Sequence, residues 1–309
     1  MLLQAVRPYP RSVKPVEPSG YLACMLSVAL PLFLLSVQTQ PLPFNLNRPD
    51  AVLHLPESLT EVSALTDIDE HTVACVEDEQ AVIYLIDLGT GRITGTRAFG
   101  MPGDLEGLTR VGLEYYALRS DGLMYRMTLG EREMNVLDTF RVRLPQDNLE
   151  GLGYDERRNR VLISPKGVMK GSPAVRDLRA IYAYDAINRK LLPEPVLQFT
   201  VTGIIAQARA AGIIIPERVT PKGRTVPSLK LRFSSVAVDP LEDNYYLLSA
   251  VDRVLLVMDR NGRVVGLHQL NEQLFPKPEG ITFLPSGAML ISNEGKDSRP
   301  NLLRFERKP

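Results

Sequence analysis

The sequence is poor in the residues that most often build redox, metal or triad sites. Its 309 residues include no tryptophan, two cysteines and three histidines. Cys24 lies in an apolar run near the N-terminus, so a domain after that run holds Cys75 alone and depends on core packing, not on an internal disulfide. His54, His71 and His268 are scattered along the chain, which gives little support to a zinc site or a histidine-based triad.

A net charge is also absent, because 36 basic residues balance 36 acidic ones. Without a net positive field, the sequence predicts no nucleic-acid partner. Hydrophobic residues make up 44% of the chain, which also carries 24 prolines and 22 glycines. This composition is typical of a globular protein rich in turns and not of a disordered chain.

Familiar catalytic motifs are missing as well. The sequence contains no nucleophile elbow, Walker phosphate loop, dinucleotide fingerprint, HExxH helix or pair of neighbouring cysteines. A non-enzymatic role is therefore favoured over catalysis.

The chain begins with a targeting segment. Arg7, Arg11 and Lys14 precede a run of 17 residues, 21–37, that is almost without polar groups. This run is slightly shorter than the roughly 20 residues that span a bilayer, so a cleaved signal peptide and a membrane anchor both remain open. Either one places the rest of the chain at the extracytoplasmic face of the cell membrane, with the positive N-terminus in the cytoplasm. The predicted organisation is a basic segment 1–20, the signal peptide or anchor 21–37, a linker 38–50 and a repeat domain 51–309.

The repeat domain shows a period of about 45 residues. Glu61, Glu106 and Glu150 are spaced by 45 and 44 residues, and Ser234 precedes Glu279 by 45 residues. A polar turn, an apolar strand, a second turn and another apolar strand follow each of these residues, which is typical of strands in tight hairpins. About five repeats of this length, each with several strands, predict the blades of a propeller.

The two ends of the repeat region predict how the ring closes. The last repeat stops after its third strand near Phe305, and residues 51–55 form a further apolar strand before the first repeat. That strand would supply the missing outer strand of the last blade and remove an open edge. The predicted fold is all-β: a five-bladed β-propeller closed by an N-terminal strand and preceded by the targeting segment.

One interval is roughly forty residues longer than the others, which places an insertion at about 196–232. Its alanine-rich residues 204–211 predict a short helix ended by Gly212. The rest predicts a basic loop, either simply solvated or docked on an acidic partner or a lipid headgroup. Its charged residues are Glu217, Arg218, Lys222, Arg224, Lys230 and Arg232.

Several of these strings together resemble the SdiA-regulated (YjiK-like) family, a bacterial propeller family that is distantly similar to NHL-repeat proteins. The resemblance covers roughly residues 55–305 and rests on Glu61-Val62-Ser63-Ala64-Leu65-Thr66, Ala117-Leu118-Arg119-Ser120-Asp121-Gly122, Asn148-Leu149-Glu150-Gly151-Leu152 and Pro278-Glu279-Gly280-Ile281-Thr282-Phe283. It implies a five-bladed ring, an extracytoplasmic location near the membrane and calcium bound at a shared site, with no established activity. Ala64 and Ser234 depart from the family's pattern, and neither departure touches a carboxylate.

The repeated glutamates are the candidate site residues. The first strand of each propeller blade lines the central channel, so Glu61, Glu106, Glu150 and Glu279 are expected to converge there. Carboxylates gathered in one funnel repel one another unless a cation, protons or hydrogen-bond donors offset their charge, and Ca²⁺ binds six to eight oxygens with tolerant geometry. The sequence therefore predicts calcium as the cofactor at these residues. The structural alternative is that the glutamates accept backbone hydrogen bonds and link neighbouring blades.

A second layer of polar side chains follows about fifteen residues later in each repeat. Arg119 and Lys166 in this layer would either neutralise the glutamates, which removes the need for a metal, or bind an anionic ligand. Asp104 and Asn148, each two residues before a repeat glutamate, would add oxygens near the channel mouth. The layer comprises Glu77, Asp78, Arg119, Lys166, Ser249 and Glu294.

Three functions are compatible with this pattern. The first is an exported or membrane-tethered, non-enzymatic propeller that binds calcium and presents one face to a protein or a small ligand. The second is a calcium-dependent hydrolase of a phosphate, lactone or ester, in which the four glutamates hold the metal. The third is a metal-free structural interaction ring.

Overall fold

The computed structural model describes residues 42–295 and 298–308. The predicted segments 1–20 and 21–37 lie outside the described residues. Within the described part of the chain, no helix combines the length and the apolar character needed to cross a membrane.

The described residues form five sheets of the kind predicted from the repeats. Blade 1 contains β2 (Val62–Asp67), β3 (Thr72–Glu77), β4 (Val82–Asp87) and β5 (Ile93–Ala98). Blade 2 contains β6 (Leu105–Val111), β7 (Glu114–Arg119), β8 (Leu123–Leu129) and β9 (Met134–Arg141). Blade 3 contains β10 (Leu149–Asp155), β11 (Arg160–Pro165), β12 (Leu178–Asp185), β13 (Lys190–Leu191) and β14 (Leu197–Thr200).

The last two blades follow the insertion. Blade 4 contains β17 (Ser235–Val238), β18 (Tyr245–Ser249), β19 (Val254–Met258) and β20 (Val264–Gln269). Blade 5 contains β21 (Pro278–Phe283), β22 (Met289–Asn293), β23 (Asn301–Phe305) and β1 (Ala51–His54). Two 3₁₀ helices, Glu57–Leu59 and Glu156–Arg158, lie between strands.

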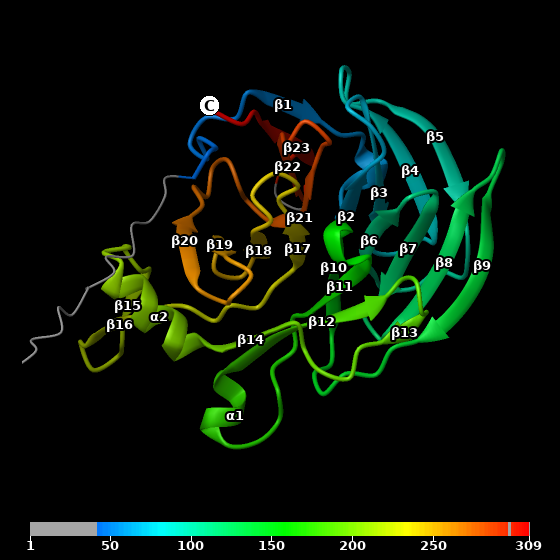
Figure 1. Cartoon of the computed structure of the whole chain (residues 1–309). Helices are drawn as coiled ribbons and strands as arrows, with labels where there is room; N and C mark the ends of the chain where they lie inside the picture. The colour runs from blue at the N-terminus through cyan, green and yellow to red at the C-terminus, as the bar shows by residue number, and fades with distance from the viewer. Residues whose placement is uncertain (1–41, 296–297, 309) are drawn as a thin grey trace, which may run out of the picture. The chain divides into compact units, whose positions relative to one another are not determined.

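The first strands of the blades lie side by side around one axis (Figure 1). In the order β2, β6, β10, β17 and β21, each contacts the next, and β21 contacts β2. This closed circle of inner strands confirms the five-bladed β-propeller.

Strand β1 closes the ring as predicted. It pairs antiparallel with β23, with Ala51 opposite Arg304 and Leu53 opposite Leu302. The first described strand therefore completes the last blade and covers its outer edge.

The core lies between neighbouring blades. Tyr246 in blade 4 packs edge to face on Phe283 in blade 5, with ring centroids 4.9 Å apart. Every residue of β18, β19 and β22 is buried. Both faces of a blade are covered by its neighbours, so the middle strands have continuous apolar runs and not an alternating pattern.

Glycines allow the inner strands to approach one another near the axis. A Cβ added to Gly153 of β10 would lie 2.3 Å from the carbonyl oxygen of Val236 in β17. A Cβ on Gly107 of β6 would lie 2.8 Å from Cγ of Leu152 in β10. Larger residues at these two positions would force blades 2, 3 and 4 apart.

The insertion contains a helix where the alanine-rich sequence predicts one. Helix α2 (Val201–Ala210) starts earlier than expected because the Thr200 hydroxyl accepts a hydrogen bond from the backbone N–H of Gly203 at 3.0 Å and caps it. Ile204 and Ala208 bury one face of α2 against the core between blades 3 and 4. A short helix α1 (Pro173–Asp177) between β11 and β12 was not predicted.

The end of the predicted linker packs on the propeller. Phe44 is 5% exposed and contacts the same aromatic cluster as Tyr246 and Phe283. The backbone N–H of Lys308 donates to the carbonyl oxygen of Pro43 at 2.8 Å. Residues 42–50 are therefore a packed part of the domain, not a free tether.

Candidate functional site

Each inner strand of blades 2, 3 and 5 begins with a β-bulge, and a glutamate occupies it. Glu106, Glu150 and Glu279 are the unpaired residues between two paired neighbours on β6, β10 and β21. A bulge re-aims the side chain of its extra residue relative to the regular pleat. The three glutamates are thus equivalent, at one end of the central channel.

Blade 1 corrects the predicted equivalence of Glu61. In β2 the pairing shifts between Val62 and Ala64, so Ser63 occupies the bulge. Glu61 lies two residues earlier, at the position of Asp104 and Asn148 in the next two blades. The repeat pattern aligned Glu61 with the other glutamates because it also lies at the start of an apolar strand. Only the pairing of β2 with β3 shows that Ser63, and not Glu61, occupies the bulge.

Two serines, Ser63 in the bulge of blade 1 and Ser234 just before β17 of blade 4, link neighbouring blades. The Ser63 hydroxyl donates to the carbonyl oxygen of Leu105 in blade 2 at 2.7 Å. In blade 4 the Ser234 hydroxyl donates to the carbonyl oxygen of Pro278 in blade 5 at 3.3 Å. In blades 1 and 4 a serine, not a glutamate, makes the hydrogen bond between blades at this point.

Lys166 pairs with one of the glutamates, Glu150, and its pKa responds to the charges of the other two. Glu150 is 1% exposed and accepts hydrogen bonds from Lys166 Nζ at 2.8 Å and from Asn148 Nδ2 at 2.7 Å. Burial alone would lower the pKa of Lys166, but the carboxylates of Glu279, Glu150 and Glu106 raise it above its usual value. We call Glu106, Glu150, Glu279 and Lys166 the glutamate mouth.

The glutamate mouth holds more carboxylates than ammonium groups. Burial, and then the charges of Glu150 and Asp104, raise the pKa of Glu106 to about 9. Burial raises the pKa of Glu279 to about 7, although Lys166 lowers it. These carboxyls therefore retain protons at or near neutral pH when no further cation offsets their charge.

A cavity of about 350 Å³ adjoins the glutamate mouth. Glu279, which is 4% exposed, contributes to its wall, and the only ion pair of Glu279 among the described residues is with Lys277 Nζ at 3.5 Å. Blade 4 has Ser234 and not a glutamate just before its inner strand, and its side of the cavity carries Ala250 and Val251. The lining residues are Lys166, Ala250, Val251, Arg253, Pro276, Lys277, Glu279 and Glu294.

Comparisons with known proteins find similar structures but no similar sequence family. No protein-family model matches the sequence, and no curated protein matches it. Among solved structures, the chain is similar to a glutaminyl cyclase of Myxococcus xanthus, with a TM-score of 0.56 and 14% sequence identity over 84% of this chain and 96% of that chain. It is also similar to a chain of the mitotic checkpoint complex, with a TM-score of 0.42 and 12% identity over 80% of this chain and 64% of that chain.

The feature shared with the cyclase is the β-propeller. At 14% identity, the likeness to the cyclase shows the fold alone. Membership of the SdiA-regulated family stays a prediction.

The second layer of side chains lies around the same mouth with several different partners. Glu77 accepts backbone hydrogen bonds from Glu79 at 3.0 Å and Gln80 at 2.6 Å, and so caps its own turn. Burial and the charges of Glu61 and Glu294 raise the pKa of Asp78 to about 6.

The remaining members of the layer are mostly paired. Arg119 pairs with Asp121 at 3.2 Å, and the Ser249 hydroxyl donates to the Asp252 carboxylate at 2.8 Å. Glu294 pairs with Lys277 at 2.5 Å. Of this layer, Lys166 and Glu294 line the cavity.

The predicted calcium site has no preformed ligand cluster. Within residues 42–295 and 298–308, no three Asp, Glu, His or Cys side chains are grouped as the ligands of a metal ion. Lys166 lies among Glu150, Glu279 and Glu106 as a fixed positive charge. A calcium ion would have to displace or accommodate this ammonium group.

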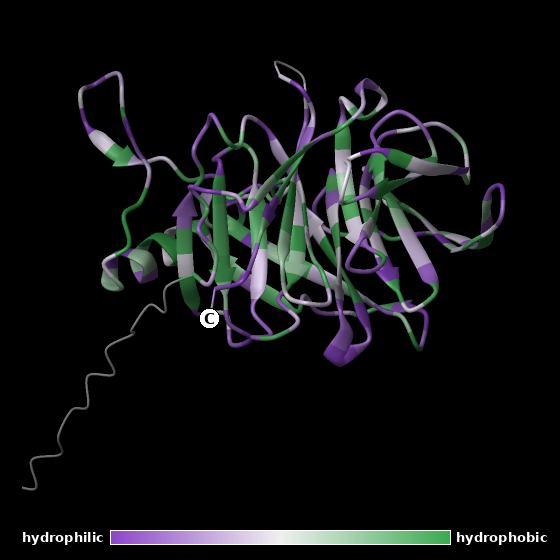
Figure 2. Ribbon diagram, turned by 90° about the horizontal axis from the view of Figure 1, so that it is seen from above, coloured by the Kyte–Doolittle hydropathy of each residue, from purple (hydrophilic) through white to green (hydrophobic). Residues whose placement is uncertain are grey.

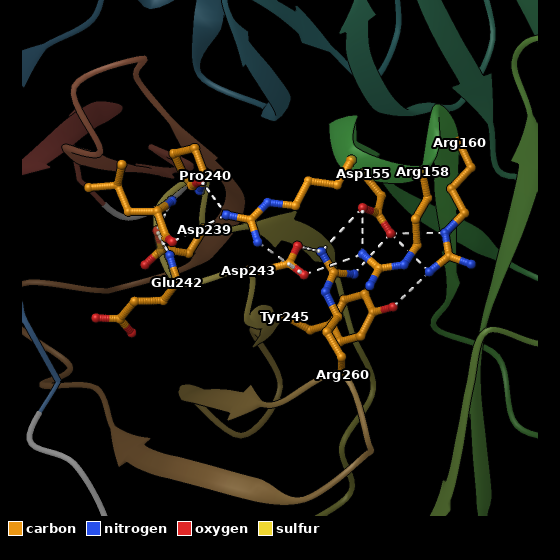
Figure 3. Close-up of polar contacts among 11 residues, drawn as sticks. Asp155, Arg158, Arg160, Asp239, Pro240, Glu242, Asp243, Tyr245 and Arg260 are labelled. Atoms are coloured by element: carbon orange, nitrogen blue, oxygen red, sulfur yellow. Dashed lines mark hydrogen bonds and ion pairs between the residues drawn. The ribbon is translucent and has the colours of Figure 1, made fainter.

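The opposite ends of the inner strands carry a network of ion pairs between aspartates and arginines, which the sequence pattern did not reveal. Asp155 at the end of β10 is fully buried and pairs with Arg160 and Arg260 at 2.9 Å and with Arg158 at 3.4 Å (Figure 3). Arg260 also pairs with Asp243. Its guanidinium carbon lies 4.2 Å from the centre of the Tyr245 ring.

A third aspartate extends this network into blade 5. Asp239 accepts hydrogen bonds from Nη1 and Nη2 of Arg307, both at 2.9 Å. Burial would raise the pKa of Asp243, but hydrogen bonds from Arg260 and Arg158 hold it below its usual value. We call Asp155, Asp239 and Asp243 with their arginines the aspartate network. It adjoins a second cavity of about 340 Å³ at this end of the channel.

Proposed function

We propose that the protein is a binding module that takes a small molecule with a primary amine into the cavity beside the glutamate mouth. The observation that carries this proposal is Glu279: its carboxylate is almost completely buried, forms part of the cavity wall and has one long ion pair among the described residues. An ammonium group beside it would replace the proton that the carboxyl otherwise retains near neutral pH.

The rest of the cavity suits such a ligand. Ala250, Val251 and Pro276 supply apolar surface. The charged part of the wall consists of two acids, Glu279 and Glu294, and three cations, Lys166, Arg253 and Lys277, of which Lys277 pairs with Glu294 and Lys166 with Glu150. A cavity of about 350 Å³ is within the range of small-molecule sites, which combine apolar walls with a few polar groups.

Isothermal titration calorimetry with two matched probes tests this proposal. L-leucinamide carries the amine, and 4-methylpentanamide lacks it and is otherwise of the same shape. We expect leucinamide alone to bind, and we expect Glu279→Gln to abolish the binding because the neutral amide cannot pair with an ammonium group.

The control is Glu133→Gln, which alters an exposed glutamate in the turn before β9. It should bind leucinamide as the unaltered protein does. Equal binding of both probes, or unchanged binding by Glu279→Gln, would contradict the amine site.

Calcium is the second candidate ligand, favoured by the excess of carboxylates. Asp104, Glu106, Glu150 and Glu279 all contribute to the raised pKa values of this mouth. A divalent cation would release the retained protons. Calcium titrations in two buffers with different ionisation enthalpies should then show proton release that Glu106→Gln combined with Glu150→Gln removes.

Catalysis at the same mouth is a third candidate. A carboxyl with a pKa of about 7 can exchange protons at neutral pH, and one solved structure with a similar fold is named a glutaminyl cyclase. Incubation with a peptide that begins with glutamine, followed by mass spectrometry for loss of ammonia, tests that activity. A panel of phosphate, lactone and ester substrates with and without chelator tests the predicted calcium-dependent hydrolase.

The proposed location is the extracytoplasmic face of the cell membrane, with residues 21–37 as signal peptide or anchor. The support is the apolar run and the positive residues before it. Fusion of alkaline phosphatase, an enzyme active only after export, to the C-terminus should give an active enzyme, and deletion of residues 1–37 should abolish that activity.

A further inference from the structure

The insertion carries a hairpin that belongs to no blade. Strands β15 (Glu217–Val219) and β16 (Thr225–Pro227) pair only with each other, and the hairpin projects from the body of the propeller (Figure 2). We call residues 216–232 the basic hairpin.

The base of the basic hairpin is firmly held. The backbone N–H groups of Lys230 and Leu231 donate to the two carboxylate oxygens of Asp252 at 2.9 and 2.7 Å. Arg179 Nε donates to the carbonyl oxygen of Leu231 at 2.8 Å, and the Leu231 side chain is fully buried. The projecting part is therefore presented in a defined direction, not as a free tail.

The charges of the basic hairpin are unbalanced. Its only acid, Glu217, lies 3.9 Å from Arg209 of α2. None of its five cations has an ion pair among the described residues, and all five are exposed. They are Arg218, Lys222, Arg224, Lys230 and Arg232.

Exposed apolar side chains accompany these cations. Ile214, just before the hairpin, is 90% exposed, and Val219 in β15 is 69% exposed. Large apolar side chains that stand free beside a cluster of cations are typical of surfaces that enter the headgroup region of a membrane.

We propose that the basic hairpin binds the surface of an anionic lipid bilayer, independently of any ligand at the glutamate mouth. The cations meet the phosphate groups of anionic lipids, and Val219 and Ile214 insert between headgroups. An acidic peptide would satisfy the cations but would leave both apolar side chains in water, so the bilayer fits the complete set of residues better.

The absence of tryptophan makes a direct test possible. The full chain with Val219→Trp carries one tryptophan, on an exposed strand of the basic hairpin. Its emission should shift to shorter wavelength with vesicles of phosphatidylglycerol and phosphatidylcholine, but not with pure phosphatidylcholine. Leu113→Trp, at an 85% exposed position between β6 and β7, is the matched control and should show no shift.

Removal of charge tests the electrostatic part. Arg218→Gln, Lys222→Gln and Arg224→Gln, added together to Val219→Trp, should weaken vesicle binding on the order of a hundredfold, about fivefold for each cation. Added salt should weaken binding of the parent reporter as well. The proposal is overturned if pure phosphatidylcholine gives the same shift, if the triple variant binds equally well, or if poly-L-glutamate shifts the emission and anionic vesicles do not.

Discussion

The two ends of the channel both gather carboxylates, but only one end matches them with cations. In the aspartate network, Asp155 has three arginine partners, and hydrogen bonds from arginines lower the pKa of Asp243. At the glutamate mouth, Lys166 serves several carboxylates, and the pKa of Glu106 is raised to about 9.

This difference separates charges that hold the ring together from charges that are free to bind. Asp155 of blade 3 and Asp243 of blade 4 share Arg260, so the aspartate network joins two blades. At the glutamate mouth Glu150 has Lys166 as a close partner, whereas Glu279 has one ion pair of 3.5 Å among the described residues. Carboxylates with so few cationic partners destabilise the empty protein in their charged form. A cation that binds beside these carboxylates offsets their charge and stabilises the folded protein. This is the basis of the proposed function.

The largest expected effect is the loss of Asp155. Asp155→Ala leaves Arg158, Arg160 and Arg260 close together without their shared counter-ion, so the free energy of unfolding should fall by about 3–5 kcal/mol. Urea denaturation at neutral pH measures the change. Glu156→Ala, at the exposed neighbouring position, should stay within about 0.5 kcal/mol. If the two variants lose equal stability, the aspartate network does not join the blades energetically.

The pH dependence of stability should follow the glutamate mouth. The folded protein holds protons on Glu106 and Glu279 up to about pH 9 and 7, whereas the unfolded chain releases them at the usual glutamate pKa. Between these limits the folded state binds more protons, so stability should fall as pH rises, by about 2–4 kcal/mol from pH 5 to pH 8. Glu106→Gln with Glu279→Gln should flatten this profile. A profile that remains as steep in the double variant would assign the titration to other groups.

The fold was largely accessible from the sequence because propeller blades repeat a local pattern. Turn residues and apolar strands recur with a period near 45, and the spare strand at residues 51–55 predicted the closure by β1. The N-cap at Thr200 and the packing of Phe44 were missed, because each depends on a contact with a distant or neighbouring segment that the repeat does not encode.

The site was only partly accessible. Their common sequence context predicted that Glu106, Glu150 and Glu279 are equivalent, and each occupies the bulge of its own inner strand, which was not predicted. A shift of two residues separates Glu61 from that position. The aspartate network escaped detection because its residues come from different blades and have no common spacing. The position of Glu61 depends on which residues pair between strands, and the aspartate network depends on which blades are neighbours. The local sequence encodes neither.

Removal of the Lys166 ammonium group should have a smaller effect on stability, and this effect should depend on pH. Lys166→Met deprives Glu150 of its partner at 2.8 Å, so it should lower the free energy of unfolding by about 2 kcal/mol at pH 8. The loss should be smaller at pH 5, where Glu106 and Glu279 hold protons and the pKa of Glu150 is also raised by burial. Lys170→Met is the control, because Lys170 is 90% exposed and its pair with Asp147 is solvated. Equal losses at both pH values would mean that Lys166 contributes by packing and not by charge.

The smallest effect distinguishes the two kinds of bulge. Ser63→Ala removes the hydrogen bond to the carbonyl oxygen of Leu105 and should lower stability by about 1 kcal/mol at both pH 5 and pH 8. Ser63→Glu loses the same link and adds a carboxylate at the bulge position, so its further loss should appear at pH 8 and disappear at pH 5. Denaturation of both variants at the two pH values makes the comparison. If Ser63→Glu lowers the free energy of unfolding no more than Ser63→Ala does at pH 8, the bulge of blade 1 does not face the glutamate mouth. Equivalent strand register would then not be enough to bring a side chain near Glu106, Glu150 and Glu279.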